Sequence, residues 1–172
     1  APSVREALLW LSRSAVHGNA DAQYTLASRY ATGQGVSRDD REAVNWYRQA
    51  ARQGHPGALF EMGNIYASGR GVSRNDKEAV DWYQQAAEQG HAGAQYTLAV
   101  WYLSGRGVPL STVDAFNWFR KAADQGLGLA RQELGRMYAD GQGTARNDAE
   151  AVKWYRLAAD QNLPLAQLML GL

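Results

Sequence analysis

Five of the six tryptophans in this 172-residue chain lie 36 residues apart, and this spacing constrains the fold more than any other feature. The tryptophans are Trp10, Trp46, Trp82, Trp118 and Trp154. The same period holds for Ala22, Ala58, Ala94, Ala130 and Ala166, for Tyr30, Tyr66, Tyr102 and Tyr138, and for glycine pairs that begin at Gly33, Gly69, Gly105 and Gly141. A fixed period of this length indicates one structural unit copied along the chain. The sequence therefore predicts a repeat protein.

The period divides the chain into four complete units with a partial one at each end. The complete units are residues 19–54, 55–90, 91–126 and 127–162. Residues 3–18 match only the second half of a unit, and residues 163–172 match only the beginning of the first half. We expect one solenoid over residues 1–172. Because its last residues are apolar rather than those of a polar capping repeat, we also expect further repeats or domains in a longer protein.

The second unit shows how one copy folds. Small and apolar residues follow one helical face from about residue 56 to 67, and Gly69 then ends this helix. Asn75 and Glu78 form a capping-box pattern before a second helix over residues 76–89. In that helix we expect Trp82 and Tyr83 to fill the core. Each unit is thus predicted to be an antiparallel helix-turn-helix hairpin whose apolar face is covered by its neighbour, which makes the fold class all-α.

Composition argues against several classes of function. Eighteen Lys and Arg residues against 17 Asp and Glu residues give a net charge of +1, which disfavours nucleic-acid binding. No apolar run is long enough to insert into a membrane. The chain contains no cysteine, so disulfides and thiolate metal sites are excluded. His17, His55 and His91 are too far apart in the predicted fold to share a metal ion.

The sequence also contains no recognisable catalytic motif. No serine precedes a lysine by three residues, and no Gly-x-Ser-x-Gly segment occurs. Asp40, Asp76 and Asp148 recur at the predicted starts of second helices, where carboxylates favour the helix dipole. We therefore expect no enzyme activity, cofactor or metal.

The consensus of the units is A-x-x-x-L-G/A-x-x-Y-x-x-G-x-G-V followed by D-x-x-A-x-x-W-Y-x-x-A-A. This pattern resembles the Sel1-like repeat family, whose α-solenoids are related to tetratricopeptide repeats. The resemblance implies a right-handed superhelix and a role as a protein–protein adaptor, often in bacterial envelope, secretion or signalling systems. It favours the periplasm or the cell envelope, with the cytoplasm as the alternative. Some secreted members carry a disulfide in each repeat, and this chain does not.

In tetratricopeptide-like superhelices, one side of each first helix lines a concave groove, and we expect a partner to bind there. Two rows of candidate residues follow from the period. The first row is Tyr24, Phe60, Tyr96 and Gln132, and the second row is Ser28, Asn64, Val100 and Arg136. Exposed aromatic residues are frequent anchors for peptides. The alternative is that the rings of the first row pack against the neighbouring repeat.

The third unit departs most from the consensus. Its linker reads VPLSTVD, and its first helix carries Trp101, the one tryptophan outside the period. We expect Tyr96, Val100 and Trp101 to form a recognition anchor. The alternatives are neutral drift and packing of Trp101 against Leu110.

Together these features predict a non-enzymatic scaffold that binds a protein or peptide on its concave surface. One alternative is a structural spacer within a larger bacterial envelope or secretion protein. The other is a module that binds cell-wall glycan through the aromatic first row.

Overall fold

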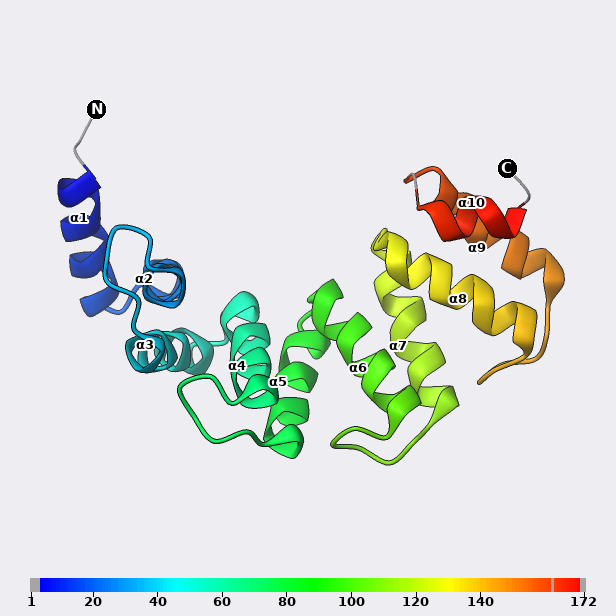
Figure 1. Cartoon of the computed structure of the whole chain (residues 1–172), viewed down its shortest axis with the longest axis horizontal. Coiled ribbons are helices and arrows are strands. Elements are labelled where there is room, and N and C mark those ends of the chain that lie inside the picture. Colours follow the sequence, from blue (N-terminus) through cyan, green and yellow to red (C-terminus); the bar gives the residue numbers. More distant parts are fainter. Residues whose placement is uncertain (1–3, 162, 171–172) are drawn as a thin grey trace. The chain divides into compact units, whose positions relative to one another are not determined.

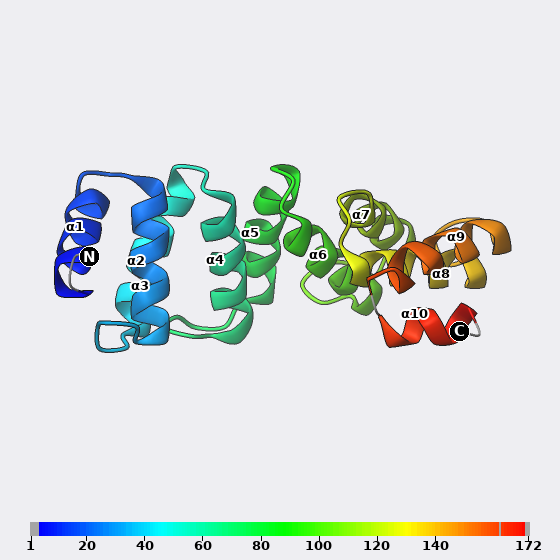
Figure 2. The ribbon, with the colours of Figure 1, turned by 90° about the horizontal axis from the view of Figure 1, so that it is seen from above.

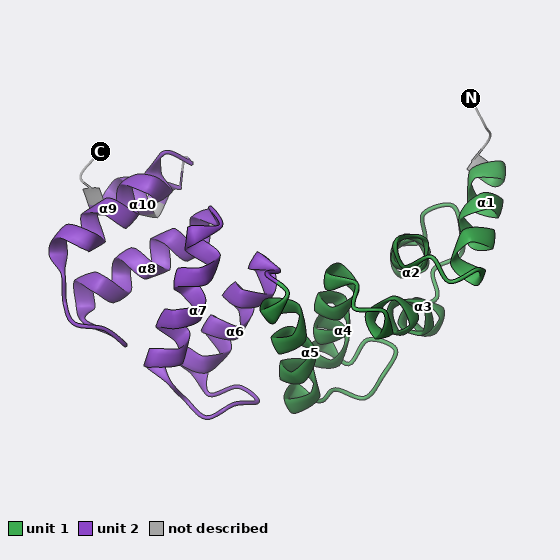
Figure 3. Ribbon diagram, turned by 180° about the vertical axis from the view of Figure 1, so that it is seen from behind, with its two compact units in different colours: residues 1–89 green, residues 90–172 purple. Residues whose placement is uncertain are grey.

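A computed structural model describes residues 4–161 and 163–170 of the chain. It consists of two compact units, residues 1–89 and residues 90–172, which we call unit 1 and unit 2 (Figure 3). The 36-residue copies seen in the sequence are called repeats from here on. Helices make up 74% of the described residues, and all regular elements among them are helical. The predicted all-α solenoid of helix hairpins is confirmed.

The described residues of unit 1 form five helices that follow one another along the chain (Figures 1 and 2). They are α1 (Val4–Val16), α2 (Ala20–Thr32), α3 (Asp40–Arg52), α4 (Pro56–Ser68) and α5 (Asp76–Glu88). The most extensive contacts join α2 to α3 and α4 to α5, so these pairs are the hairpins. Contacts of α1 with α2 connect the first hairpin to the preceding helix, and contacts of α3 with α4 connect the two hairpins.

Unit 2 repeats this arrangement with α6 (Ala92–Ser104), α7 (Thr112–Asp124), α8 (Gly128–Asp140), α9 (Asp148–Ala159) and α10 (Pro164–Leu170). Its hairpins are α6 with α7 and α8 with α9, while α7 contacts α8 and α9 contacts α10. The helices predicted for the second repeat, residues 56–67 and 76–89, agree with α4 and α5 to within one residue at each end.

The histidines at the repeat junctions cap the first helices. The Nδ1 atom of His55 accepts a hydrogen bond from the backbone N–H of Ala58, and His91 does the same for Ala94, each at 3.1 Å. Asn19 caps α2 in the same way through its side-chain oxygen. These side chains satisfy an N–H group that a helix start leaves without a partner. The periodic histidines therefore have a structural role.

The predicted caps of the second helices are present, but one detail of the capping box is different. Asn75 accepts from the backbone N–H of Glu78 at 3.2 Å. In a capping box, Glu78 would in turn accept from the backbone N–H of Asn75. That N–H instead donates to the carbonyl of Tyr66 in the preceding helix, at 2.9 Å. The cap thus also fixes the linker against the first helix of its own hairpin.

Of the two neighbouring aromatic residues that the sequence placed in the core of each hairpin, the one after tryptophan is the more deeply buried. The most buried ring of each hairpin belongs to the residue after tryptophan, namely Tyr47, Tyr83, Phe119 and Tyr155, all at most 5% exposed. Trp46, Trp82 and Trp118 are only half-buried, whereas Trp154 is 8% exposed and Trp10 is 65% exposed. Adjacent helical residues point about 100° apart, so only one of the pair can face the first helix. Tyr83 takes that direction, and Trp82 lies at the edge of the buried face.

Buried glutamines connect neighbouring helices. Gln23 is 3% exposed, and its Nε2 donates to the carbonyl of Ala15 in α1 at 3.0 Å. Its Oε1 accepts from Nε2 of Gln53, which follows α3, at 2.8 Å. Gln95 and Gln125 form the same side-chain pair in unit 2. Each buried amide is thereby hydrogen-bonded, as burial of a polar group requires.

Candidate functional site: one side of the first helices

In unit 1, the first row places Tyr24 on α2 and Phe60 on α4, and both rings are half-buried. The Tyr24 ring stacks on His55 with centroids 4.6 Å apart, and it lies 5.7 Å from the ring of Tyr47. Phe60 lies 5.7 Å from the ring of Tyr83. Each ring therefore packs on its own hairpin and still keeps part of its surface exposed. Of the two hypotheses for this row, packing against the neighbouring repeat applies to Tyr24 through His55, and partner binding stays a prediction.

In unit 2, the first row places Tyr96 on α6 and Gln132 on α8, again half-buried. The Tyr96 ring meets the ring of Phe119 edge to face, with centroids 5.4 Å apart. Edge-to-face rings at this distance attract each other beyond the burial of their surface. The first-row rings of both units are thus held in place by a buried ring of the second helix.

In the first three complete repeats, the second-row residue is polar where the buried ring beneath it carries a hydroxyl group, and apolar where it does not. The hydroxyl of Tyr83 donates to Oδ1 of Asn64 at 2.8 Å, and the hydroxyls of Tyr47 and Ser28 share a hydrogen bond. In the third repeat the corresponding residues are Phe119 and Val100, and neither has a hydroxyl group. The change to Val100 is therefore accounted for by the change to Phe119. Val100 remains 38% exposed on α6.

Trp101 does not belong to this surface, so the predicted anchor of Tyr96, Val100 and Trp101 is corrected at that residue. Trp101 is 5% exposed, and the guanidinium of Arg106 covers its ring at 4.1 Å. Its position in the repeat is that of Ile65 and Met137, which are 1% and 0% exposed. Trp101 is therefore a larger side chain at a core position. Packing in the core therefore accounts for a tryptophan at this position, outside the 36-residue period of the other five.

Two carboxylates on this side of the helices were missed in the sequence. Burial raises the pKa of Tyr24 first, and the negative charge of Glu61 raises it further. Glu133 has the same secondary effect on the pKa of Tyr96, which burial again raises most. Glu133 also pairs with Arg136, whose Nε lies 3.0 Å from its Oε2. Glu61 and Glu133 hold equivalent positions in the second and fourth repeats, a pattern that their spacing of 72 residues reveals.

The burial of Tyr47 leads to a prediction about pH. Burial, with a smaller effect from Glu61, raises the pKa of Tyr47 to about 12, while an unfolded chain has a tyrosine pKa near 10. Below pH 10 both states keep the proton, so stability is unaffected. Above pH 10 the unfolded state ionises first, and we expect the free energy of unfolding to fall as pH rises toward 12, by up to about 1.4 kcal/mol per pH unit.

Denaturation at a series of pH values checks this expectation, with Tyr47→Phe as the matched control. Phe119 shows that the fold accepts phenylalanine at this position. The variant should lose less stability than the wild type between pH 10 and pH 12. An identical pH dependence in both proteins would contradict the assignment of this loss to Tyr47.

The arginines and aspartates of the linkers form local pairs away from the two rows. Arg38 with Asp40, Arg74 with Asp76, and Arg146 with Asp148 each make two hydrogen bonds of 2.8–3.3 Å. The hydrogen bond from Arg38 lowers the pKa of Asp40, and the charge of Arg38 adds to this effect. Asp40 and Asp148, whose pKa values are both lowered, thus keep their charge at a helix start, where it is favourable.

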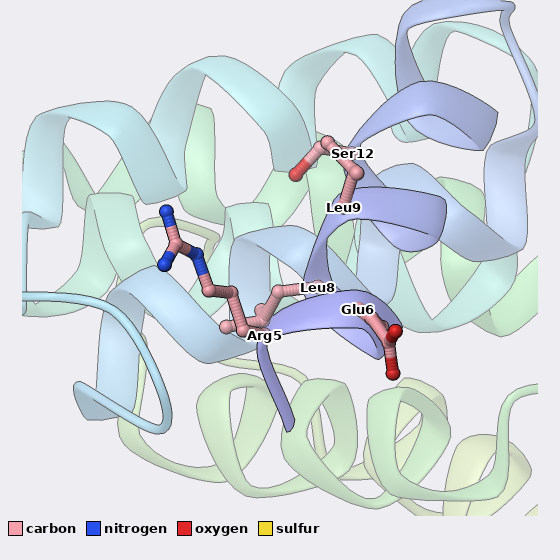
Figure 4. Close-up of a pocket in the computed structure, with 5 residues that line it drawn as sticks. All are labelled: Arg5, Glu6, Leu8, Leu9 and Ser12. Atoms are coloured by element: carbon pink, nitrogen blue, oxygen red, sulfur yellow. The ribbon is translucent and has the colours of Figure 1, made fainter. Parts of the chain in front are cut away.

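A separate hollow of about 410 Å³ lies along α1 (Figure 4). Its lining residues are Arg5, Glu6, Leu8, Leu9 and Ser12. In Figure 4 the side chains of Arg5 and Glu6 point to opposite sides of the helix. All the lining residues come from one helix, so no second element provides convergent polar groups. We do not include this hollow in the candidate site.

The described part of the chain offers neither a metal site nor a membrane-spanning helix. Residues 4–161 and 163–170 contain no cluster of three His, Asp or Glu side chains that could hold a metal ion. The longest helices described have 13 residues, whereas a helix needs about 20 to cross a membrane. None of these helices can therefore span a bilayer.

Comparison with known proteins identifies the repeat. The Sel1 repeat matches residues 20–55, 56–91, 92–127 and 129–163. A comparison with curated proteins gives no match. Sel1 repeats are often protein–protein interaction modules, bind protein partners and are generally non-catalytic.

Several solved structures share the fold. A protective antigen of uropathogenic Escherichia coli with an SLR fold is 40% identical, with a TM-score of 0.93 over 98% of this chain and 36% of its own. A Sel1 repeat protein from Oxalobacter formigenes is 36% identical, with a TM-score of 0.94 over 98% of this chain and 49% of its own. An immunity protein from Pseudomonas aeruginosa is 25% identical, with a TM-score of 0.59 over 92% of this chain and 57% of its own. The chain thus spans half or less of the first two proteins, and it belongs to the Sel1 repeat family.

Proposed function

We propose that this chain is a non-enzymatic interaction module that binds a protein or peptide segment along the exposed side of its first helices. The contact residues would be those of the first row and the second row. They are Tyr24, Ser28, Phe60, Asn64, Tyr96, Val100, Gln132 and Arg136. Trp101 is left out because it is buried.

One observation supports this proposal most. The rings of Tyr24, Phe60 and Tyr96 are each held by a buried ring at 5.4–5.7 Å, and each is still partly exposed. A partner therefore meets aromatic surface that has already lost its rotational freedom. Fixing a side chain costs free energy on binding, so rings fixed in advance favour affinity.

The charges on this side indicate what kind of segment would fit. Glu133 is paired with Arg136, and Arg136 also reaches Asp140 at 3.4 Å. Glu61 accepts a hydrogen bond from Asn64 at 3.3 Å. No cluster of lysines that would clamp a carboxylate lines either row. We infer that aromatic and apolar contacts, rather than a charged terminus, determine affinity.

Selection of peptides from a random display library on the purified chain tests the proposal. Selected peptides should bind Tyr96→Ala at least about 30-fold more weakly than the wild type, since a central aromatic anchor carries about 2 kcal/mol or more. Affinity is measured by fluorescence anisotropy, and circular dichroism confirms that each variant is folded.

Val113→Ala is the matched control, because Val113 is an apolar residue that is 56% exposed on the second helix α7. It should leave the affinity unchanged. If no peptide is enriched, the chain is better described as a spacer. Peptides that bind the wild type, Tyr24→Ala, Phe60→Ala and Tyr96→Ala equally would place the binding surface elsewhere.

A further inference from the structure

A small apolar pocket opens beside the first-row position of α8. Its volume is about 170 Å³, and its lining residues are Gln132, Glu133, Arg136, Tyr155 and Met169. These residues come from α8, α9 and α10, which are consecutive helices of unit 2. Unlike the hollow along α1, this pocket has walls from several elements.

The repeat explains why a pocket lies here. In the first three complete repeats, the first row provides a ring that packs 5.4–5.7 Å from the buried ring of the second helix. In the fourth repeat the buried ring is still present, because Tyr155 is 5% exposed. The first-row residue, however, is Gln132. The space beside Tyr155 that a ring fills in the other repeats is therefore open to the surface.

The remaining walls favour an uncharged aromatic group. Met169 stands 36 residues after Glu133, so it replaces the carboxylate that Glu61 and Glu133 present to the neighbouring tyrosines. A thioether attracts aromatic rings, and it accepts only a weak hydrogen bond from a hydroxyl. At the rim, Glu133 and Arg136 neutralise each other at 3.0 Å. The charges at the rim thus complement a neutral side chain.

We propose that this pocket receives a phenylalanine side chain of the partner polypeptide, which supplies the ring that the fourth repeat lacks. This inference rests on the proposed function. An apolar cavity of about 150 Å³ is sufficient for one benzene ring, so the pocket has room for one ring and no more. Phenylalanine is preferred to tyrosine because Met169 stands at the position from which Glu61 and Glu133 act on the tyrosines of the first and third complete repeats.

The methionines provide a direct assay. The chain has three of them, and Met62 and Met137 are fully buried whereas Met169 is 52% exposed in the pocket wall. We suggest labelling the methionine methyl groups with carbon-13 and titrating the 172-residue chain with N-acetylphenylalaninamide. The Met169 signal should move upfield and saturate, with a dissociation constant on the order of 1–10 mM. The signals of Met62 and Met137 should stay in place.

Two variants and one second probe complete the experiment. Gln132→Phe fills the pocket from within, so it should abolish the Met169 response and leave the melting temperature equal or higher. Gln132→Ala leaves the pocket open and should keep the response. N-acetylleucinamide should bind at least about 3-fold more weakly. No saturable response, an equal response in Gln132→Phe, or equal binding of the leucine probe would overturn the proposal.

This assay is independent of peptide selection. Saturable binding of the phenylalanine probe without any enriched peptide would support the pocket as a binding site and contradict the proposed function. Enriched peptides whose affinity depends on Tyr96, but which do not shift the Met169 signal, would support the proposed function. They would show that the pocket takes no part in it.

Discussion

The Phe119→Ala variant is expected to lose about 3–5 kcal/mol of the free energy of unfolding, which is the usual cost of deleting a buried ring. Phe119 is 0% exposed and packs edge to face with Tyr96. It belongs to a core cluster that also contains Ala99 and Leu134 from the two first helices on either side of it. Truncation therefore leaves a cavity where three helices of unit 2 meet.

Trp118→Ala is the informative comparison, because the sequence alone places the periodic tryptophans in the core. Trp118 is half-buried and lies at the edge of the same cluster. We expect a smaller loss than for Phe119→Ala, measured by urea denaturation of both variants. A larger loss for Trp118→Ala would show that the tryptophan, and not the residue after it, is the main core residue of the repeat.

The second large effect is expected for Gly71→Ala, at about 2–5 kcal/mol of destabilisation. Gly71 has φ of 75°, where an alanine costs about 1–2 kcal/mol. An added Cβ would also lie 2.8 Å from the backbone carbonyl oxygen of Asp40 and 3.1 Å from the Val44 side chain, at the start of α3. Because backbone atoms cannot move aside easily, this overlap adds a cost of about 1–3 kcal/mol.

Gly18→Ala separates the two contributions. Gly18 has φ of 90°, but an added Cβ there would meet nothing within 4 Å. It should therefore show the conformational cost alone, and the difference between the two variants in urea denaturation gives the cost of the close approach. Equal losses would mean that the linker moves away from α3 without penalty.

Much of the fold could be predicted because its determinants are local. Gly69 has φ of 74° and ends α4, and Asn75 caps α5, as their positions in the sequence indicated. Helix ends depend on residues within one turn, and the 36-residue period fixes how often those ends recur. The hairpins, and the bounds of the second repeat's helices to within one residue, therefore follow from the sequence.

The candidate site was predictable only in part. The two rows lie on the first helices as expected, because helical spacing alone decides which residues share a face. The sequence could not decide whether Tyr24 packs or is exposed, since that depends on His55 and Tyr47 from other helices. Glu61 and Glu133 could have been found from their spacing of 72 residues, but their effect on the pKa of Tyr24 and Tyr96 depends on how the helices pack.

The sequence by itself determined the repeat, the hairpin and the surface on which the rows lie. Only the tertiary structure decided that Tyr83 rather than Trp82 faces the first helix, that Trp101 is buried, and that a pocket opens beside Gln132. The physical reason is that burial depends on the side chains that other helices pack against a residue. The period shows which positions recur along the chain. The side chains packed against a position decide whether its residue is buried or exposed.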